Sequence, residues 1–434
     1  MGEIYSRSNF VLFALGRLVS LIGAGIQMIA LPLFILDTTG SASMMGIFTL
    51  LSIVPRLAAT PFAGVLGDRW NRKKIMVYAD FGHGVILYLL GVIALYRQIT
   101  IPVLFVSTAL LSVLDAFFSG ATAGMLPDIV PEANLKRANS TLGLVSGISS
   151  IIGPVVGGIL YGLTGILGVF FINATCFTLS AISEIFIRYE PKLRSEKLSV
   201  VGFVRDLKEG ASFVFAKKGL KVLFIFAMFL NFLSAPLLYI VFPFILKTTI
   251  QFSSDQYGYL QSAFVVGALI GNIVIIKFLL KASNRKMLIG GLFAQYGFLF
   301  LFALTLFQPM FGWLQSRLSL YFWIGAAFFA LTGYFNTLVN VPINTNLQVM
   351  TPTHIRSRVF SVLDLLSQIM IPIGAVIYGY LMDNIPVHWF LIANNALCVL
   401  VTVVFLWVAP PEVYDPHLES ATTVENAVSC SGNL

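Results

Sequence analysis

The sequence predicts an all-α polytopic membrane protein with twelve transmembrane helices in two pseudo-symmetric six-helix halves. Three observations lead to this prediction. Of the 434 residues, 58% are hydrophobic and only 11% are charged, a balance that water-soluble domains do not show. Apolar runs of about 20 residues, the length that crosses a bilayer, recur along nearly the whole chain. In addition, short sequences of the first half return in the second half.

The apolar runs are continuous, which favours helices over a β-barrel, whose strands would alternate between apolar and polar residues. The first run is too long for a signal peptide and lacks a small-residue cleavage site, so we expect a retained first span. The expected spans are 10–36, 41–66, 75–96, 101–127, 139–163, 166–188, 219–246, 256–280, 287–307, 318–349, 358–381 and 387–409.

The distribution of basic residues predicts the orientation of these spans. Most of the 27 Lys and Arg residues lie in loops that share one face, and only Arg97, Lys247 and Arg317 lie in loops on the other. Basic loops stay in the cytoplasm, which places both termini there, and the expected location is the plasma membrane of a bacterial cell. The net charge of +8 therefore belongs to membrane loops, and nucleic acid is not an expected partner.

One long polar stretch divides the chain. We expect a first half at 1–188, a cytoplasmic linker at 189–218, a second half at 219–410 and a disordered acidic tail at 411–434. Apolar residues at helical spacing between 201 and 215 fit either an amphipathic helix on the inner membrane surface or a solvated connector.

Three pairs of short sequences recur at nearly constant spacing between the halves. Residues 31–39 resemble 242–249, and 71–73 recur as 284–286. Gly153-Pro154 and Tyr161-Gly162 have counterparts in Pro372 and Tyr378-Gly379. Two repeated six-helix bundles around a central site are the architecture of alternating-access transporters.

The stretch 64–74 interrupts two apolar runs with four basic groups and a carboxylate, and so predicts a tight turn at the membrane face. It resembles the loop between spans 2 and 3 of the major facilitator superfamily, and that resemblance extends over essentially the whole chain. Asn71 stands where the family usually has glycine, and asparagine also tolerates a positive φ. The residues that match or support this loop are Gly64, Asp68, Arg69, Arg72, Lys73 and Lys74.

The physical role that we expect for this loop is a charge clasp. Asp68 can meet the positive N-terminus of another helix, for which we expect span 11, while Arg69 and Arg72 bind neighbouring carboxylates such as Asp128. The alternative is that Arg69 to Lys74 only anchor the orientation of the protein in the membrane.

Gly153, Pro154, Gly157 and Gly158 resemble the core of the superfamily's antiporter signature, although Ser140 and Ser149 replace glycines of the fuller pattern. Glycines allow helices to approach closely and proline bends a span, so the segment can be a flexible seam or ordinary close packing. The resemblance implies export rather than uptake. Residues 126–131, 137–140, 351–352 and 356–360 are similar to the branch that holds macrolide-type drug efflux pumps and enterobactin exporters.

The resemblance implies that spans 1, 4, 7 and 10 line the central cavity. Span 10 carries Asn336, Asn340, Asn344 and Gln348 on one helical face. Amides are costly in hydrocarbon, so this face is a candidate substrate surface, or else it forms hydrogen bonds between helices.

Ionisable residues deep in spans are functional candidates, here Asp115, Arg17 and Arg56. Protonation of an Asp115 paired with an arginine would release the pair and couple transport to protons. Span 4 lacks the arginine of many proton-coupled drug antiporters, which leaves the coupling ion open. Asp80, Asp364 and Glu184 lie nearer the inner span ends, where snorkelling or capping explains them, and His83 is expected to be a structural partner.

Enzyme classes find no support in the sequence. No glycine-rich nucleotide loop follows a strand, no catalytic triad or metal cluster is recognisable, and Cys176, Cys398 and Cys430 are scattered. The sequence therefore predicts a monomeric secondary exporter of amphipathic or hydrophobic small molecules such as drugs, without cofactor or metal, with protons as the coupling ion. Export of an endogenous siderophore or lipid, and a transporter-derived receptor or accessory subunit without flux, are the alternatives.

Overall fold

The computed structural model describes residues 7–97, 99–190, 200–280 and 282–414, with the side chains of Arg7, Val65, 67–69, Val200 and Val201 outside this description. Within the described residues, regular secondary structure is entirely helical, and eleven helical segments are long and apolar enough to cross a membrane. One of them, Glu132–Ile185, is 54 residues long and contains two spans. The predicted all-α membrane fold with twelve spans is confirmed.

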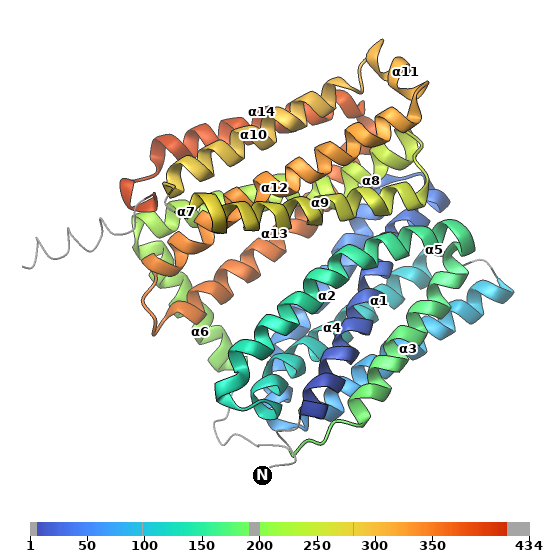
Figure 1. The fold of residues 1–434 in the computed structure, drawn as a ribbon, viewed down its shortest axis with the longest axis vertical. Helices are drawn as coiled ribbons and strands as arrows, with labels where there is room; N and C mark the ends of the chain where they lie inside the picture. The colour runs from blue at the N-terminus through green and yellow to red at the C-terminus, as the bar shows by residue number, and fades with distance from the viewer. Residues whose placement is uncertain (1–6, 98, 191–199, 281, 415–434) are drawn as a thin grey trace, which may run out of the picture. The chain divides into compact units, whose positions relative to one another are not determined.

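The helices follow the predicted order along the chain (Figure 1). They are α1 (Arg7–Thr39), α2 (Ala42–Arg69), α3 (Arg72–Tyr96), α4 (Ile101–Ile129), α5 (Leu135–Ile185), α6 (Val200–Ala216), α7 (Lys218–Pro236), α8 (Phe242–Phe244), α9 (Ser254–Val274), α10 (Asn284–Leu304), α11 (Met310–Gln315), α12 (Leu318–Met350), α13 (Arg356–Asn384) and α14 (Val387–Val408). Wider π-helical turns at Leu237–Val241 and Ile245–Thr249 join α7 and α8 into the seventh span.

Spans 5 and 6 form one continuous element, α5, whose two arms Figure 1 shows. Gly165 separates them with φ 62° and ψ −164°. A side chain would be strained in this conformation, and glycine adopts it freely. The break therefore falls where the sequence predicts it, between 163 and 166.

The chain forms two compact units. Unit 1 contains Met1–Phe203, Leu238–Ser262 and Ala375–Asp383, and unit 2 contains Val204–Leu237, Ala263–Gly374 and Asn384–Leu434. In unit 1, α5 packs along α1 and α3, while α4 packs along α2 and α3. One buried core of this unit is formed by side chains such as Met76, Ala121 and Met125.

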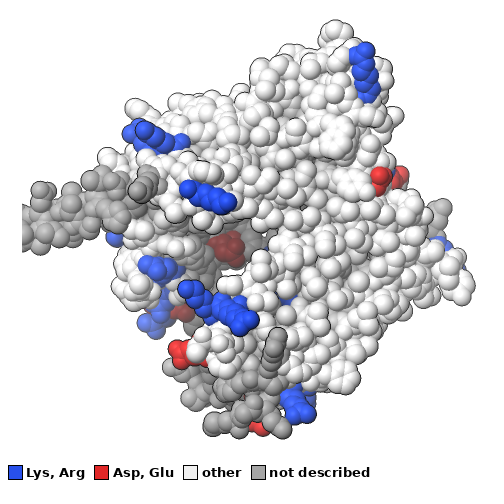
Figure 2. Space-filling view, viewed as in Figure 1, with Lys and Arg blue, Asp and Glu red and all other residues white. Residues whose placement is uncertain are grey.

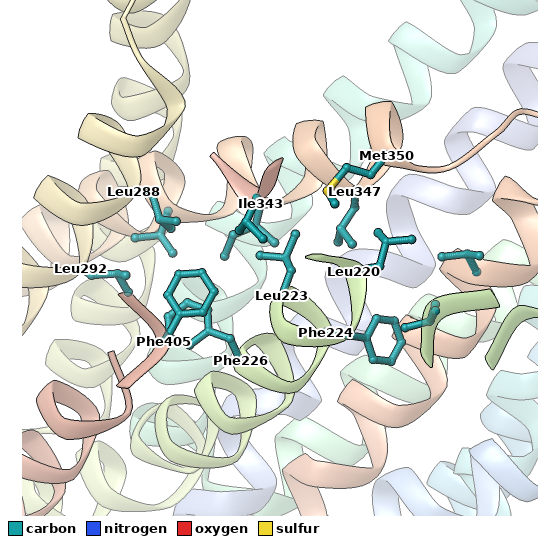
Figure 3. Packing of buried hydrophobic residues seen from close by; sticks show 14 of the residues in the cluster. Leu220, Leu223, Phe224, Phe226, Leu288, Leu292, Ile343, Leu347, Met350 and Phe405 are labelled. Carbon is teal, nitrogen blue, oxygen red and sulfur yellow. The ribbon is translucent and has the colours of Figure 1, made fainter. Parts of the chain in front are cut away.

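In unit 2, α10 packs against α12 and α14, and α14 packs against α7. Figure 3 shows the core between these helices, where large apolar side chains interdigitate. Phe226 and Phe405 stack with ring centroids 3.8 Å apart. Figure 2 shows wide uncharged areas on the visible face, with charged side chains in small separate groups, as expected for a surface that faces lipid.

The linker contains the helix α6, as its apolar spacing predicts, but α6 has a protein partner. Val214 is fully buried in the core of unit 2, and Leu207, Ala211 and Phe213 pack against that core. Arg358 of α13 pairs with both Asp206, at 2.9 Å, and Glu209 of α6. The apolar stripe is therefore covered by other helices of unit 2, which differs from both a membrane-surface helix and a solvated connector.

The interruption at 64–74 is more helical than expected. Helix α2 continues to Arg69 and α3 begins at Arg72, so the turn itself is limited to Trp70 and Asn71. Asn71 has φ −66° and its side chain accepts a hydrogen bond from the backbone N–H of Lys74. Asn71 therefore does not use the positive φ that asparagine tolerates, and it acts instead as a helix N-cap.

Candidate functional site

A cluster of ionisable side chains lies inside unit 1. It is built from four helices: Arg17 of α1, Asp80 and His83 of α3, Asp115 of α4, and Glu184 of α5. Asp80 is 1% exposed and Glu184 2%. The snorkelling interpretation of these two carboxyls was therefore wrong, since neither reaches the surface of the unit. Asp364, by contrast, is exposed on α13 and accepts a hydrogen bond from Gln368.

Each of the two ring nitrogens of His83 lies close to an oxygen that can accept a hydrogen bond. Its Nδ1 lies 2.9 Å from the carbonyl oxygen of Ala79, and its Nε2 lies 3.2 Å from Oδ1 of Asp115. A carbonyl only accepts, so we assign a proton to Nδ1, and when Nε2 is protonated as well, the imidazolium forms an ion pair with the carboxylate of Asp115. The imidazole also stacks on Phe177 with centroids 4.6 Å apart, which holds the ring in place.

Asp115 thus pairs with a histidine, whereas an arginine was expected. Its side chain is 50% exposed, while that of His83 is 3% exposed. In this pair the buried imidazole of His83 is therefore next to the half-exposed carboxyl of Asp115. This pair could not be predicted from the sequence, because residues 83 and 115 lie on different helices and only the packing of α3 on α4 brings them together.

Arg17 is the cation of the cluster. Its guanidinium lies over the ring of Phe118, 5.5 Å from the centroid, and within electrostatic range of Asp80, Glu184 and Asp115. Arg56 is half-buried on α2 and lies within electrostatic range of Tyr239. Of the three coupling candidates, Arg17 and Asp115 thus share a cluster.

The loop residues form a second group of polar contacts. Arg72 Nη1 lies 2.7 Å from Oδ2 of Asp128 and donates to the carbonyl of Gly124 at 3.0 Å, so the predicted pair with Asp128 is present. Lys73 Nζ donates to the carbonyl of Ile185 at 2.6 Å, and the backbone N–H of Lys74 donates to the side chain of Asn71.

For the three other members of the predicted loop, Asp68, Arg69 and Gly64, the structure provides no test of the clasp. The side chains of Asp68 and Arg69 lie outside the described residues. Gly64 is exposed, and a Cβ at this position would meet no atom within 4 Å. The role of Asp68 as a clasp therefore stays a prediction.

Tyr189 completes the surroundings of Asp128. Its hydroxyl donates to Oδ2 of Asp128 at 3.1 Å. Burial and the neighbouring Asp128 carboxylate raise the pKa of Tyr189 to about 12. The phenol therefore remains a neutral donor at physiological pH.

The four residues of the antiporter-like segment lie at close backbone contacts. A Cβ on Gly153 would lie 2.8 Å from the Cα of Gly25, and one on Gly157 would lie 2.9 Å from the Cα of Ile26, both on α1. A Cβ on Gly158 would meet the carbonyl of Ser254, and one on Gly258 would lie 2.5 Å from the carbonyl of Pro154. Within unit 1, α5 thus contacts α1 on one side and the start of α9 on another.

The amides of α12 form a ladder on its surface. Asn340 Nδ2 donates to Oδ1 of Asn336 at 2.9 Å, and Asn344 Nδ2 donates to the carbonyl of Asn340 at 2.9 Å. Asn340, Asn344 and Gln348 are exposed and Asn336 is half-buried. The ladder therefore presents polar groups along one side of an otherwise apolar helix.

A further amide of α12, Asn346, has a structural role that was not predicted from the sequence. It is 2% exposed, donates to the carbonyl of Val413 at 2.7 Å and accepts from Asn284 at 2.6 Å. Its position two residues beyond Asn344 puts it on the opposite face of the helix, and this was the signal available.

Another polar contact that was not predicted from the sequence lies at the start of α2. Asp383, at the end of α13, accepts hydrogen bonds from the hydroxyl of Ser41 at 2.7 Å and the backbone N–H groups of Ala42 at 2.7 Å and Ser43 at 3.0 Å. A carboxylate at a helix N-terminus neutralises free N–H groups and the positive end of the helix dipole.

Metal-ligating side chains do not gather in the part of the chain that the structure describes. It contains no group of three or more His, Cys, Asp or Glu side chains placed to hold an ion. The candidate functional groups are the buried ionisable side chains of unit 1 and the amides of α12.

Comparison with known proteins gives the family. Macrolide efflux protein A of Streptococcus pyogenes is 26% identical over 396 residues, which cover 88% of this chain and 91% of that protein. Multidrug efflux pump Tap of Mycobacterium tuberculosis is 25% identical over 391 residues, 87% of each protein. The crystal structure of a bacterial homologue of the human lysosomal transporter Spinster shares the fold, with a TM-score of 0.71 at 15% identity over 94% of this chain and 97% of that one.

The family profile described as Major Facilitator Superfamily matches residues 13–314 and 224–427, which together span nearly the whole chain. The chain is therefore a multi-pass membrane transporter, not an enzyme, and it belongs to the major facilitator superfamily.

Proposed function

We propose that this transporter exports amphipathic or hydrophobic small molecules, of the drug and macrolide class, by alternating access and in exchange for protons. It acts as a monomer in the plasma membrane of a bacterial cell, with both termini in the cytoplasm. The observation that carries the substrate class is the similarity, over most of both chains, to a macrolide efflux protein and a multidrug efflux pump.

The charged cluster of unit 1 supports proton coupling. Charges inside a membrane protein are costly and are retained for ion or proton pathways. The side chain of Asp115 is half exposed and lies 3.2 Å from the buried His83, while Arg17 supplies a compensating charge. Asp115→Asn is expected to abolish proton-driven export and leave expression unchanged, whereas full activity in this variant would remove Asp115 from the mechanism.

The amide ladder of α12 supports a role in substrate binding. Amphipathic drugs present a few hydrogen-bonding groups on an apolar body, and pockets for such molecules combine apolar walls with few polar groups. Asn340 and Asn344 offer amide groups at an exposed face of an apolar helix. In this proposal they fix the orientation of the substrate, while its apolar body contacts neighbouring side chains.

The proposal can be tested in everted membrane vesicles whose lumen is acidified. Labelled macrolides, lipophilic dyes, a siderophore and a lipid are offered in parallel, with and without an ionophore that collapses the pH gradient. Ionophore-sensitive accumulation of macrolides or dyes is the expected result. Accumulation of the siderophore or lipid alone would overturn the drug assignment, and no accumulation of any compound would favour a receptor or accessory subunit.

Variants test the substrate face in the same assay. Asn340→Leu and Asn344→Leu should each weaken substrate binding by about fivefold, since one hydrogen bond between neutral groups contributes on the order of 1 kcal/mol. Asn272→Leu is the matched control, because Asn272 is also exposed and donates to the carbonyl four residues earlier, on α9. Equal effects at all three sites would contradict the assignment of α12.

A further inference from the structure

Three carboxyl oxygens of the cluster in unit 1 are buried without a hydrogen-bond partner within the geometric limits, among the described residues. They are Oδ1 and Oδ2 of Asp80 and Oε2 of Glu184. The hydroxyl of Ser180, the polar group beside Asp80, donates to the carbonyl of Gly16 at 3.0 Å. An ionised carboxylate in such surroundings is costly, because burial removes it from solvent and no donor compensates its charge.

The charges around these carboxyls do not balance when all groups are ionised. Helix α1 contributes Arg17, α3 contributes His83 besides Asp80, α4 contributes Asp115, and α5 contributes Glu184. With His83 protonated on both nitrogens, its charge is balanced by the carboxylate of Asp115 at 3.2 Å, so the two are neutral as an ion pair. One cation, Arg17, then faces two carboxyls, so that binding one proton makes the whole cluster neutral.

We propose that Asp80 and Glu184 are the proton-binding carboxyls of this transporter, and that His83 and Asp115 relay the proton to the accessible side of unit 1. This inference rests on the proposed proton-coupled export and names its ion site. The two carboxyls hold one exchangeable proton beside Arg17. When the proton leaves, the second negative charge is uncompensated inside the unit, and the cluster must gain water or move relative to Arg17.

The position of the site suits a coupling role. Asp80 and Glu184 lie on α3 and α5, which pack together, and α5 also packs along α1, the helix of Arg17. On that same α1 interface Gly23 and Gly25 lie so close to α5 that a Cβ on either would collide with it. A change of charge between these helices therefore acts directly on a tightly packed interface.

Single substitutions provide the test, because each leaves one carboxylate opposite one cation. Asp80→Asn and Glu184→Gln should both fold, since Arg17 then has one neutralising partner and no proton is needed. Asp364→Asn is the control: it removes an exposed carboxyl on α13. Folding is checked by size-exclusion chromatography of the purified proteins.

Transport is measured in two modes in proteoliposomes. A pH gradient of one unit supports about tenfold substrate accumulation for each coupled proton. Wild type and Asp364→Asn should reach this level, while Asp80→Asn and Glu184→Gln should accumulate no more substrate than without a gradient. Substrate exchange at equal concentrations and equal pH needs no net proton movement and should continue in all four proteins. A merely structural role would reduce both modes together.

Infrared spectroscopy of the purified proteins gives a readout that does not depend on transport. The carbonyl stretching band of a protonated buried carboxyl should be present at neutral pH in wild type and Asp364→Asn, and absent in Asp80→Asn and Glu184→Gln. Gradient-driven accumulation that survives in both variants, or a band that neither substitution removes, would overturn the inference. If wild type shows the band and the variants lose it but no protein transports with a gradient, the proton site stands and the proposed function fails.

Discussion

Arg72 is held at the beginning of α3 by a carboxylate and a backbone carbonyl. Its guanidinium lies 2.7 Å from Asp128 with side-chain exposures of 7% and 9%, and it donates to the carbonyl of Gly124. A Cβ on Gly124 would lie 2.5 Å from Nε of Arg72, so glycine leaves the space that the guanidinium occupies. The pair fastens the start of α3 to the end of α4.

Replacing Arg72 by alanine should destabilise the protein strongly. Asp128 would remain buried without its cation, a change that costs about 3 to 5 kcal/mol. The control is Arg137→Ala, which removes an exposed arginine on α5 and should change stability by less than about 0.5 kcal/mol. Thermal unfolding in detergent measures the difference, and similar midpoints for the two variants would contradict a structural role of the pair.

Tyr189→Phe removes a second contact of Asp128 and should cost about 1 kcal/mol. Because the pKa of Tyr189 is raised to about 12, the stabilisation by this hydrogen bond is fully present below the ordinary tyrosine pKa of about 10. It is lost as the pH rises through the raised value. The difference in unfolding midpoint between wild type and variant should therefore stay constant from neutral to mildly alkaline pH, and a difference that disappears at neutral pH would show that the bond is absent.

For single residues, the sequence predicted which ionisable side chains are important better than it predicted their burial and their contacts. The pair Arg72–Asp128 could be predicted because two charged residues end neighbouring spans. The burial of Asp80 and Glu184 could not, because hydropathy gives the depth of a residue along its helix and not the direction in which its side chain points. That direction decides whether a carboxyl snorkels to water or is buried within electrostatic range of Arg17.

The proline and glycines of helix α5 lie at its contacts with two other helices, α1 and α9. Its residue Gly153 approaches Gly25 of α1, and Pro154 approaches Gly258 of α9. Small residues allow such backbone contact, which in membranes replaces much of the hydrophobic driving force between helices. The sequence pattern indicated close packing, while the partners of each glycine became known only from the structure.

Gly153→Ala tests this interface against Gly147→Ala on the same helix. A Cβ at Gly153 would lie 2.8 Å from Gly25, whereas one at Gly147 would have no neighbour within 4 Å. Overpacking at Gly153 should cost about 1 to 3 kcal/mol, and Gly147→Ala should be neutral or slightly stabilising because alanine favours the helix. Unfolding midpoints in detergent report both, and a stable Gly153→Ala variant would argue against tight packing there.

The cap of α2 by Asp383 joins residues that are 340 positions apart in the chain. Asp383→Ala should release the N–H groups of Ala42 and Ser43 and destabilise the first turn of α2 by about 1 to 2 kcal/mol. Hydrogen exchange of peptides from this turn should accelerate relative to wild type. Asp364→Asn on the same helix α13 should leave the exchange of that turn unchanged, and equal exchange in all three proteins would show that the cap is not maintained.

For the whole molecule, the positive-inside pattern predicts cytoplasmic termini. An epitope tag added after Leu434 should be inaccessible to antibody in intact cells and become accessible after permeabilisation. A tag inserted in the loop at Arg97 should show the reverse behaviour, because this loop is predicted to lie outside. Staining of the C-terminal tag in intact cells would invert the topology and, with it, the direction of the proposed export.

The sequence by itself determined the twelve membrane spans, their approximate ends and the transporter family, because the bilayer imposes one length and one polarity on every spanning helix. The family follows from short motifs at set places between those spans. Only the tertiary structure decided which polar side chains come together: His83 with Asp115, Asp383 with the start of α2, and Asp80 and Glu184 within electrostatic range of Arg17. These contacts join different helices, and the rotation of each helix about its axis, which sets them, is determined by packing rather than by hydropathy.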